Sequence, residues 1–272
     1  MNANKQLWEK GDFTKLADCM RQSGAELVER IGIAPGETVL DLGCGDGTTA
    51  LPAAERGAVV TGVDIAANLV AAGQRRAEQA GLTNITFEEG DATDLAALGD
   101  ERFDRVVSIF GAMFAPRPDQ VAREMVRVTK PGGTIVMGNW IPGDPTLVAQ
   151  ILKTSAAFTP PPPEGFVSPM LWGDEGVVRE RFAAAGIPGE SVTCERDLFT
   201  FRRDSPPADF LDLFLNFYGP TMNAVEAAER DQRGGALCDE LGRLFDSQNA
   251  SGDAGKTEIP AAFLRVTVRK PG

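Results

Sequence analysis

The sequence predicts a doubly wound α/β fold: a mostly parallel sheet of seven strands, with a helical cap inserted before the last strand. Three observations support this fold class. Short apolar runs that are typical of buried strands alternate with stretches of helical periodicity in the first half of the chain. Two of these runs end in an aspartate, and the first leads into a glycine-rich loop. Strands and helices that alternate at this spacing form a parallel sheet covered on both faces.

The expected elements follow one another along the chain. An amphipathic helix is expected from Thr14 to Ile33, where apolar residues recur every three or four positions, and Pro35-Gly36 ends it. Strands are expected at residues 38–40, 59–63, 85–88, 105–109, 134–137, 192–202 and 261–269. Further helices are expected at residues 51–56, 68–80, 118–128, 206–215 and 230–247. A proline-rich turn at residues 159–165 is stiff enough for a connector or the base of a lid.

The composition is that of an ordinary globular protein, with 43% hydrophobic and 24% charged residues. The 27 lysines and arginines against 39 aspartates and glutamates give a formal charge of -12. Such a surface repels phosphate backbones, so nucleic acid is not expected as a substrate. The N-terminus has no apolar core of signal-peptide length, and no run approaches the roughly 20 apolar residues that span a bilayer. The sequence therefore predicts a cytoplasmic protein without a membrane span.

Cysteine and histidine usage narrows the chemistry. Cys19, Cys44, Cys194 and Cys238 lie far apart without a CxxC pair, so free thiols are expected rather than a zinc site or a redox dithiol. The sequence contains no histidine, which excludes a Ser-His-Asp triad, a Cys-His dyad and every histidine-ligated metal site. No metal is expected, and any reaction must proceed without imidazole.

The most informative segment is the glycine loop after the first expected strand. Gly43, Gly45 and Gly47 follow Asp41 at alternate positions, and glycine permits positive φ and a close approach of the backbone to a ligand. A strand, loop and helix of this kind could also begin a dinucleotide-binding fold. The dinucleotide fingerprint would require Gly or Ala at position 48, where the residue is Thr48. Asp41 would also place a negative charge near the pyrophosphate, so a nicotinamide-dependent oxidoreductase is disfavoured.

The run Asp41-x-Gly43-x-Gly45-x-Gly47 resembles motif I of the class I S-adenosylmethionine-dependent methyltransferases, whose fold is Rossmann-like. In that family the loop packs against the methionine and ribose part of the cofactor, which implies that Cys44 lies at the cofactor too. A carboxylate at Asp41 suits a ligand that carries an ammonium and a sulfonium instead of phosphates.

Two further acidic positions agree with this resemblance. Asp64 ends the second expected strand, where a carboxylate can accept hydrogen bonds from both ribose hydroxyls, and the family carries an acid there. The resemblance places Ile65 against the adenine. Glu89-Gly90-Asp91-Ala92 resembles the family's motif after the third strand, in which the Asp91 carboxylate accepts the adenine amino group and the Ala92 N–H reaches a ring nitrogen.

The resemblance continues to about residue 140. It makes the carbonyl of Phe110 the candidate partner of the methionine ammonium, and Pro131-Gly132-Gly133 a structural turn. Residues 8–140 are most similar to small-molecule methyltransferases of the ubiquinone/menaquinone-biosynthesis type, including the leading Trp8-x-x-Gly11-Asp12.

The implied function is transfer of a methyl group from S-adenosylmethionine to a small, apolar or aromatic metabolite by in-line displacement, with S-adenosylhomocysteine as product. The sulfonium methyl is already activated, so the protein must mainly align the reactants and exclude water. An acceptor that needs deprotonation would need Asp, Glu, Lys, water or Tyr218 as its base. The sequence does not choose among these bases, so the catalytic residue stays open. Tyr218, which precedes Gly219-Pro220, a natural hinge, is one candidate. The candidate acceptor pocket, roofed by a cap that also holds Phe210 and Phe217, consists of Met113, Phe114, Trp140, Phe214 and Tyr218.

Three regions are expected on this interpretation. Residues 1–34 form a helical segment over the cofactor site, and residues 35–142 form the S-adenosylmethionine-binding core. Residues 143–272 hold the rest of the sheet, with a mobile cap at about 206–248 and the final strand at about 261–269. The alternative function is a regulatory or assembly protein that binds S-adenosylmethionine without turnover.

Overall fold

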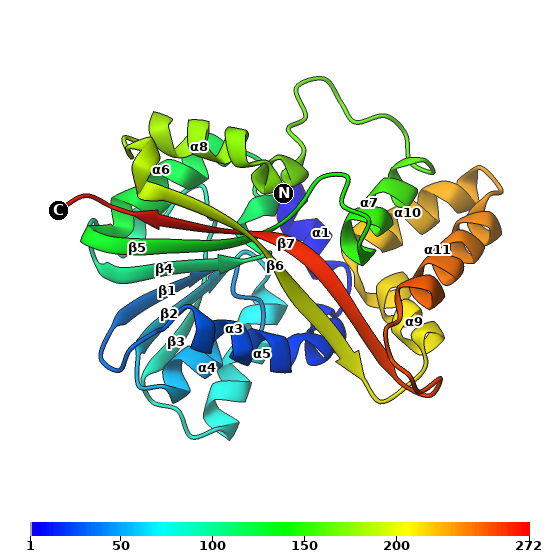
Figure 1. The fold of residues 1–272 in the computed structure, drawn as a ribbon, viewed down its shortest axis with the longest axis horizontal. Helices are drawn as coiled ribbons and strands as arrows, with labels where there is room; N and C mark the ends of the chain where they lie inside the picture. Colours follow the sequence, from blue (N-terminus) through cyan, green and yellow to red (C-terminus); the bar gives the residue numbers. More distant parts are fainter. Residues whose placement is uncertain (1) are drawn as a thin grey trace.

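The computed structural model describes residues 2–272 and centres on one seven-stranded sheet with the order β3-β2-β1-β4-β5-β7-β6 (Figure 1). The strands are β1 Thr38–Leu42, β2 Val59–Asp64, β3 Ile85–Glu89, β4 Phe103–Ile109, β5 Thr129–Trp140, β6 Val192–Arg203 and β7 Thr257–Arg269. β7 runs antiparallel to its neighbours β5 and β6, and the other neighbouring pairs are parallel. The predicted fold class is therefore confirmed, including the helical insertion before the last strand.

Helices cover both faces of this sheet. The α-helices are α1 Ala3–Glu9, α2 Phe13–Ala17, α3 Arg21–Arg30, α4 Ala50–Glu55, α5 Ala67–Gln79, α6 Pro118–Val128, α7 Leu147–Ala156, α8 Glu175–Ala184, α9 Pro207–Phe217, α10 Gly219–Arg230 and α11 Gly234–Gln248. Short 3-10 helices are η1 Asp18–Met20, η2 Ala96–Leu98, η3 Ala112–Phe114, η4 Pro169–Gly173 and η5 Gly189–Ser191. On one face α4 and α5 pack against β2 and β3, and on the other α6 packs against β5 and α8 against β6 (Figure 1).

The side chains of β5 show how one strand serves both layers. Val136 belongs to the apolar core under α3 and α4, whereas Ile135 and Met137 belong to the larger core that includes α6 and α8. Successive strand residues point to opposite faces, so a strand covered on both faces is apolar throughout. Full burial of each such side chain stabilises the fold by about 1.5–3 kcal/mol.

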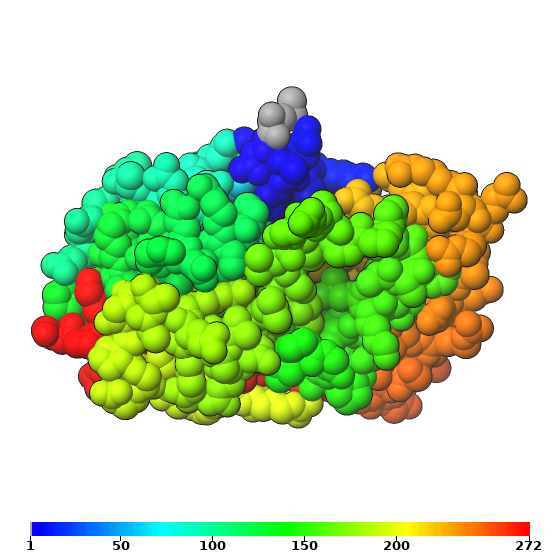
Figure 2. All heavy atoms as spheres, turned by 90° about the horizontal axis from the view of Figure 1, so that it is seen from above, coloured from blue at the N-terminus to red at the C-terminus, as the bar shows by residue number. Residues whose placement is uncertain are grey.

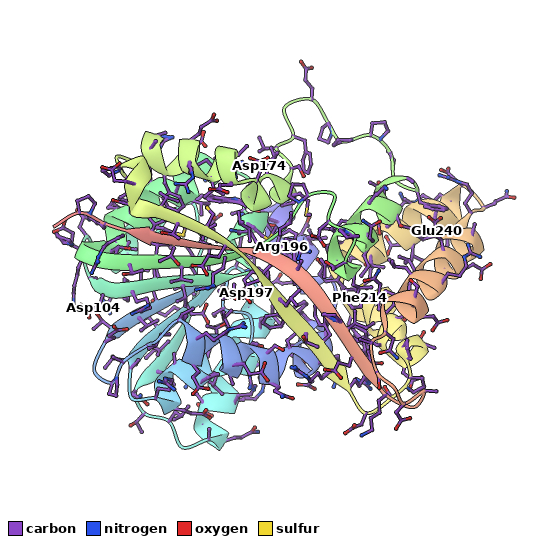
Figure 3. All side chains as sticks on the ribbon, in the orientation of Figure 1. Asp104, Asp174, Arg196, Asp197, Phe214 and Glu240 are labelled. Carbon is purple, nitrogen blue, oxygen red and sulfur yellow. The ribbon has the colours of Figure 1, made fainter. Side chains whose placement is uncertain are left out.

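The cap is attached through aromatic packing. β6 and β7 are long and carry α9, α10 and α11 at one end of the sheet (Figure 1). Phe210 and Phe214 are one helical turn apart on α9, and their ring centroids lie 5.4 Å and 5.2 Å from that of Phe245 on α11. Phe210 also lies 5.4 Å from Phe201 of β6, so the same layer joins the cap to the sheet. Figure 3 labels Phe214 beside the long strands.

The prediction of one helix from Thr14 to Ile33 was wrong. The structure divides this stretch into α2, η1 and α3, and α1 precedes it. The bend lets α3 pack on the glycine loop: a Cβ at Gly24 would lie 2.6 Å from the backbone oxygen of Thr48. The 3-10 turn η1 separates α2 from α3 at this point.

Two helices, α7 and α8, were not predicted, and α1 and α10 lie within the predicted N-terminal helical segment and helical cap without having been delimited there. α10 begins at Gly219-Pro220, which the sequence pattern suggests is a hinge. Proline is favoured in a first turn because its missing N–H would have no helical partner there. β5 begins at Thr129 and β7 at Thr257, earlier than expected, because Phe103 and Arg203 pair with these residues. No helix within residues 2–272 is both long and apolar enough to cross a membrane.

Candidate functional site

A pocket lies where the loops after the strands meet the N-terminal segment and the cap. The carboxyl ends of β1, β2, β4 and β5 all reach it, because parallel strands end at the same edge of a sheet. Many of its lining residues fall into two groups. The loop wall consists of Asp41, Gly43, Cys44, Gly45, Asp46, Thr48, Asp64, Ile65, Asp91 and Ala92. The aromatic wall consists of Trp8, Phe13, Phe110, Phe114, Trp140, Phe199, Phe201, Phe214 and Tyr218.

The glycine loop forms a tight cradle in the loop wall. Gly43, Gly45 and Gly47 have φ values of +71°, +54° and +89°. A Cβ on Gly43 would lie 2.6 Å from the Cα of Gly111, so the loops after β1 and β4 touch backbone to backbone. Gly47 does not line the pocket. A Cβ there would lie 2.2 Å from the Leu51 side chain, so its role is packing.

Asp64 ties this cradle to the next strand. Its Oδ2 accepts the Gly45 N–H at 2.8 Å, and its Oδ1 accepts the Ala66 N–H at 2.9 Å. Burial raises the pKa of Asp64, and these N–H groups oppose the rise by stabilising the carboxylate. The side chain lines the pocket with both oxygens oriented by backbone, which leaves their remaining lone pairs for a ligand.

Asp41 is a buried acid of the loop wall with a raised pKa. Only 2% of the residue is exposed, and its Oδ2 has no hydrogen-bond partner within the described chain. Burial first, and then the charge of Asp64, raise the pKa of Asp41 to about 8. A buried carboxylate oxygen without a partner is costly, and a positively charged ligand group would remove that cost.

Asp91 lies at the far end of the loop wall. Its Oδ1 accepts the N–H of Thr93 at 2.9 Å and the hydroxyl of the same residue at 2.8 Å. Its Oδ2 accepts the side-chain amide of Asn2 at 3.2 Å. Ile65 and Ala92 also line the pocket, so the structure brings these predicted residues together with Asp41 and Asp64.

Asp46 was not predicted and holds the glycine loop in place. It is 2% exposed, and its carboxylate accepts hydrogen bonds from both Nη atoms of Arg21, the first residue of α3. The same guanidinium donates to the Thr48 hydroxyl at 2.6 Å. Arg76 on α5 pairs with the same aspartate at 3.7 Å. The sequence alone does not indicate this network, because nothing near Asp46 in the chain shows which distant arginines contact it.

The aromatic wall begins next to the cradle. Phe110 has a φ of +59° and stacks on Trp140, with ring centroids 3.7 Å apart. Phe199 of β6 meets the Phe110 ring edge-on at 5.1 Å. Phe214 lies 5.3 Å from the ring of Tyr218, which joins the cap to the wall.

Tyr218 sits between the cap and the N-terminal segment. Its ring lies 6.0 Å from that of Trp8 and 6.3 Å from that of Phe13. The residue is 5% exposed and lines the pocket, and its side-chain hydroxyl has no hydrogen-bond partner within residues 2–272. Burial raises the pKa of Tyr218 above its ordinary value, so the hydroxyl keeps its proton.

Some predicted acceptor residues lie elsewhere. Met113 is 1% exposed and belongs to the core, not to the pocket wall. Phe210 is fully buried behind Phe214, and Phe217 also lies off the wall. These corrections share one cause. Helical periodicity shows which residues share a helix face, but it does not show which residues of η3 or α9 face the pocket.

The N-terminal segment supplies wall residues that sequence reasoning missed. Trp8 belongs to the resembling run Trp8-x-x-Gly11-Asp12, whereas no sequence pattern singles out Phe13. α1 bridges the two sides of the pocket: Lys5 pairs with Glu89, and Lys10 lies 2.7 Å from Glu226 of the cap. In the space-filling view the blue N-terminal segment lies between the cyan and green part of the chain and the orange cap (Figure 2).

Comparison with known proteins finds relatives over most of the chain. Residues 39–133 match a protein-family model described as a methyltransferase domain. An uncharacterised protein of Mycobacterium tuberculosis (strain H37Rv) is 36% identical over 242 residues, covering 85% of each chain. The demethylmenaquinone methyltransferase of Renibacterium salmoninarum is 37% identical over 114 residues, covering 42% of this chain and 46% of that one.

A solved structure extends the comparison to the whole chain. Phosphoethanolamine N-methyltransferase 2 of Haemonchus contortus, in complex with phosphomonomethylethanolamine and S-adenosylhomocysteine, gives a TM-score of 0.63 at 17% identity. The superposition covers 100% of this chain and 61% of that chain. At this identity the likeness concerns the fold alone.

Proposed function

Because this chain belongs to the class I methyltransferase family, we propose that it transfers a methyl group from S-adenosylmethionine to a small apolar or aromatic molecule. The observation that carries the proposal is the division of one pocket into two unlike walls. The loop wall holds a buried carboxylate, Asp41, whose Oδ2 has no partner among the described residues and suits a cationic ligand. The aromatic wall suits an apolar one.

The loop wall fits the proposed cofactor group by group. Asp41 would face the methionine ammonium together with the Phe110 carbonyl, and the cradle of Gly43, Cys44 and Gly45 would lie against the methionine and ribose. Asp64 would accept the ribose hydroxyls with its remaining lone pairs.

The adenine would lie at the other end of the same wall. Ile65 would contact its ring, Asp91 would accept its amino group, and the Ala92 N–H would reach a ring nitrogen. A complex of the Haemonchus contortus enzyme with S-adenosylmethionine, at a TM-score of 0.62, supports the use of this cofactor by the shared fold.

When bound, S-adenosylmethionine supplies a methyl group already activated by the sulfonium. The residues of this chain then have three tasks: to hold the cofactor, to orient the acceptor, and to exclude water. The last two fall to the aromatic wall, in which Trp140 and Tyr218 are buried. The formal charge of -12 supports a small molecule as acceptor rather than nucleic acid.

Titration calorimetry with S-adenosylmethionine, S-adenosylhomocysteine and NAD tests the cofactor. We expect the first two to bind and NAD not to bind. Incubation of the protein with labelled S-adenosylmethionine and metabolite pools should then give a labelled product together with S-adenosylhomocysteine. Binding without S-adenosylhomocysteine formation would favour the alternative of a binding protein without turnover. Tight, salt-sensitive association with RNA or DNA would contradict the small-molecule acceptor.

A further inference from the structure

The ionisable groups of the pocket are distributed unequally between its walls. Among the described residues that line it, the carboxyl and thiol groups belong to the loop wall: Asp41, Cys44, Asp46, Asp64 and Asp91. The aromatic wall carries one ionisable side chain, Tyr218, and no lysine or arginine from residues 2–272 lines either wall. An acceptor on the aromatic wall therefore meets neither a carboxylate nor a cation there.

The groups of the loop wall are already engaged. Asp64 and Asp91 accept backbone N–H groups, and Asp46 is paired with Arg21. Cys44 donates to the Gly45 carbonyl at 3.4 Å, and burial raises the pKa of this thiol. Asp41 is the remaining carboxyl group, and the proposed function assigns it to the ammonium of the cofactor. None of these carboxyl and thiol groups is therefore free to take a proton from an acceptor.

Tyr218 can donate a hydrogen bond but is a poor base. The residue lines the pocket and is only 5% exposed, yet its hydroxyl has no protein partner in the described chain. Three rings hold the side chain in place, those of Trp8, Phe13 and Phe214. A neutral phenol held in this way offers one O–H donor to whatever occupies the pocket.

We propose that the acceptor is a conjugated hydroxyl compound that binds already ionised, as a phenolate or enolate, with its oxygen held by the Tyr218 hydroxyl. This inference rests on the proposed function. A charge spread over a conjugated ring costs less to bring into an apolar wall than the localised charge of a carboxylate or phosphate, for which the walls provide no cation. Ordinary alcohols and protonated amines are disfavoured, because nothing on the aromatic wall removes their proton.

The reaction then balances without a proton transfer. The electron pair of the anion forms the new bond to the methyl carbon, the carbon–sulfur bond breaks, and its electron pair remains on sulfur. One negative and one positive charge cancel, which leaves a neutral methylated product and S-adenosylhomocysteine. Attack through the oxygen or through a conjugated ring carbon uses the same anion.

A matched panel of acceptors tests the proposal. The purified protein is given S-adenosylmethionine, saturating at every pH, with 4-cyanophenol, 4-hydroxyacetophenone or 1-naphthol, or with 4-cyanobenzyl alcohol or 4-cyanobenzylamine. We expect methylation of the three phenols only. Their kcat/KM should rise with pH and level off near the pKa of the free phenol, which is higher for 1-naphthol than for the other two. Methylation of the alcohol or the amine, the same pH midpoint for 1-naphthol as for the other two phenols, or no methylation of any phenol would overturn the proposal.

A binding measurement supplies a readout independent of turnover. 4-Nitrophenol absorbs differently as phenol and as phenolate, so its spectrum reports the bound form. It is titrated into the protein with sinefungin, whose amine carries a positive charge where the sulfonium would be. We expect the bound phenolate spectrum at a pH where free 4-nitrophenol is half protonated, and a neutral bound phenol would overturn the proposal. Sinefungin binding alone, measured by calorimetry, reports on the proposed function separately.

Paired hydroxyl deletions test the part assigned to Tyr218. Tyr218→Phe removes the donor and keeps the ring, and we expect KM for the phenols to rise about tenfold or more, with kcat changed less. Thr221→Val is the matched control, because this α10 hydroxyl is buried without a partner among the described residues and lies off the pocket wall. An unchanged KM in a folded Tyr218→Phe protein would overturn the hydrogen bond. If Tyr218→Phe instead loses kcat and the pH dependence of kcat/KM, Tyr218 acts as a base, and the proposal is overturned.

Discussion

The rings of Phe110 and Trp140 are stacked, with centroids 3.7 Å apart and planes inclined by 7°. Phe110 reaches this position from a φ of +59°, where residues with side chains are strained. Its N–H donates to the Gly138 carbonyl at 2.9 Å. β5 therefore holds both the ring and the backbone of the turn that joins the loop wall to the aromatic wall.

Phe110→Leu should weaken cofactor binding as well as stability. The substitution keeps an apolar side chain but loses the stack, so we expect the free energy of unfolding in urea to fall by about 0.5–1.5 kcal/mol or more. Phe245→Leu is the matched control, because this cap residue packs against aromatic rings away from the pocket. Calorimetry should show weaker S-adenosylhomocysteine binding for Phe110→Leu only. Equal affinities in the two variants would contradict the joining role of the turn.

Asp64→Asn tests the proposed ribose contact. The amide keeps one oxygen acceptor for the loop N–H groups but loses the negative charge, and we expect S-adenosylhomocysteine binding to weaken by about 1.5–3 kcal/mol. Glu88→Ala, an exposed carboxylate on the neighbouring strand β3, removes the same charge from outside the pocket and should leave the affinity unchanged. Parental affinity in folded Asp64→Asn protein would exclude the ribose assignment.

The raised pKa of Asp41 predicts pH-dependent cofactor binding. The ligand ammonium favours the carboxylate form, whereas burial and Asp64 raise the pKa of Asp41 in the free protein to about 8. Affinity for S-adenosylhomocysteine should therefore increase as the pH rises from 6 to about 8. Calorimetry in two buffers of different ionisation enthalpy should also detect proton release. Asp41→Asn should abolish both effects, and a flat pH profile of the parent would contradict the assignment.

The raised pKa of Asp41 also predicts how the stability of the ligand-free protein changes with pH. A carboxyl whose pKa is raised in the folded state, here from 3.8 to about 8, stabilises the fold at pH values below 4 and loses that contribution as the pH rises towards 8. Asp41→Asn should therefore gain stability relative to the ligand-free parent between pH 5 and pH 8. Urea denaturation at these two pH values measures the difference.

Much of the fold and of the loop wall could be predicted from sequence because local signals determine them. Asp41 and Asp64 end apolar strand runs, and the parallel topology brings strand ends to one edge. Gly43 has both a positive φ and a close backbone contact with Gly111, and glycine in the sequence is the residue that permits both.

The aromatic wall could not be predicted in the same way. Trp8 and Phe199 come from segments nearly two hundred residues apart, and no local pattern records that they share a wall. The orientation of Met113 depends on one turn of η3, which helical period does not fix. The Arg21–Asp46 pair depends on the bend before α3, which overrides the apolar periodicity of the stretch from Thr14 to Ile33.

The cap is expected to respond to ligands. Its helices α9, α10 and α11 close one side of the aromatic wall through Phe214 and Tyr218. Ordering of an acceptor between walls should slow opening of these helices, and hydrogen exchange measures that opening. We expect amides of α9–α11 to exchange more slowly with sinefungin and 4-nitrophenol bound, while amides of β1 serve as the internal reference. Equal protection with and without ligands would exclude closure.

Asn2 contacts the carboxylate oxygen of Asp91 that the adenine of the cofactor should need. Its side-chain amide donates to Asp91 Oδ2 at 3.2 Å, the atom that we propose accepts the adenine amino group. Its own Oδ1 accepts the Asn4 N–H at 3.0 Å and so caps α1. An amide donor on this carboxylate would have to leave before an adenine amine could bind there.

Asn2→Asp separates these two contacts. The carboxylate still caps α1, but it can no longer donate to Asp91 and is repelled by it, so we expect S-adenosylhomocysteine to associate several-fold faster in stopped-flow measurements. Asn223→Asp is the matched control. It makes the same change at the other end of the segment, where Lys10 donates to Asn223, and leaves Asp91 untouched. Slower association or weaker binding of Asn2→Asp would show that Asn2 supports the cofactor site, because removing a competing donor can only make Asp91 more accessible.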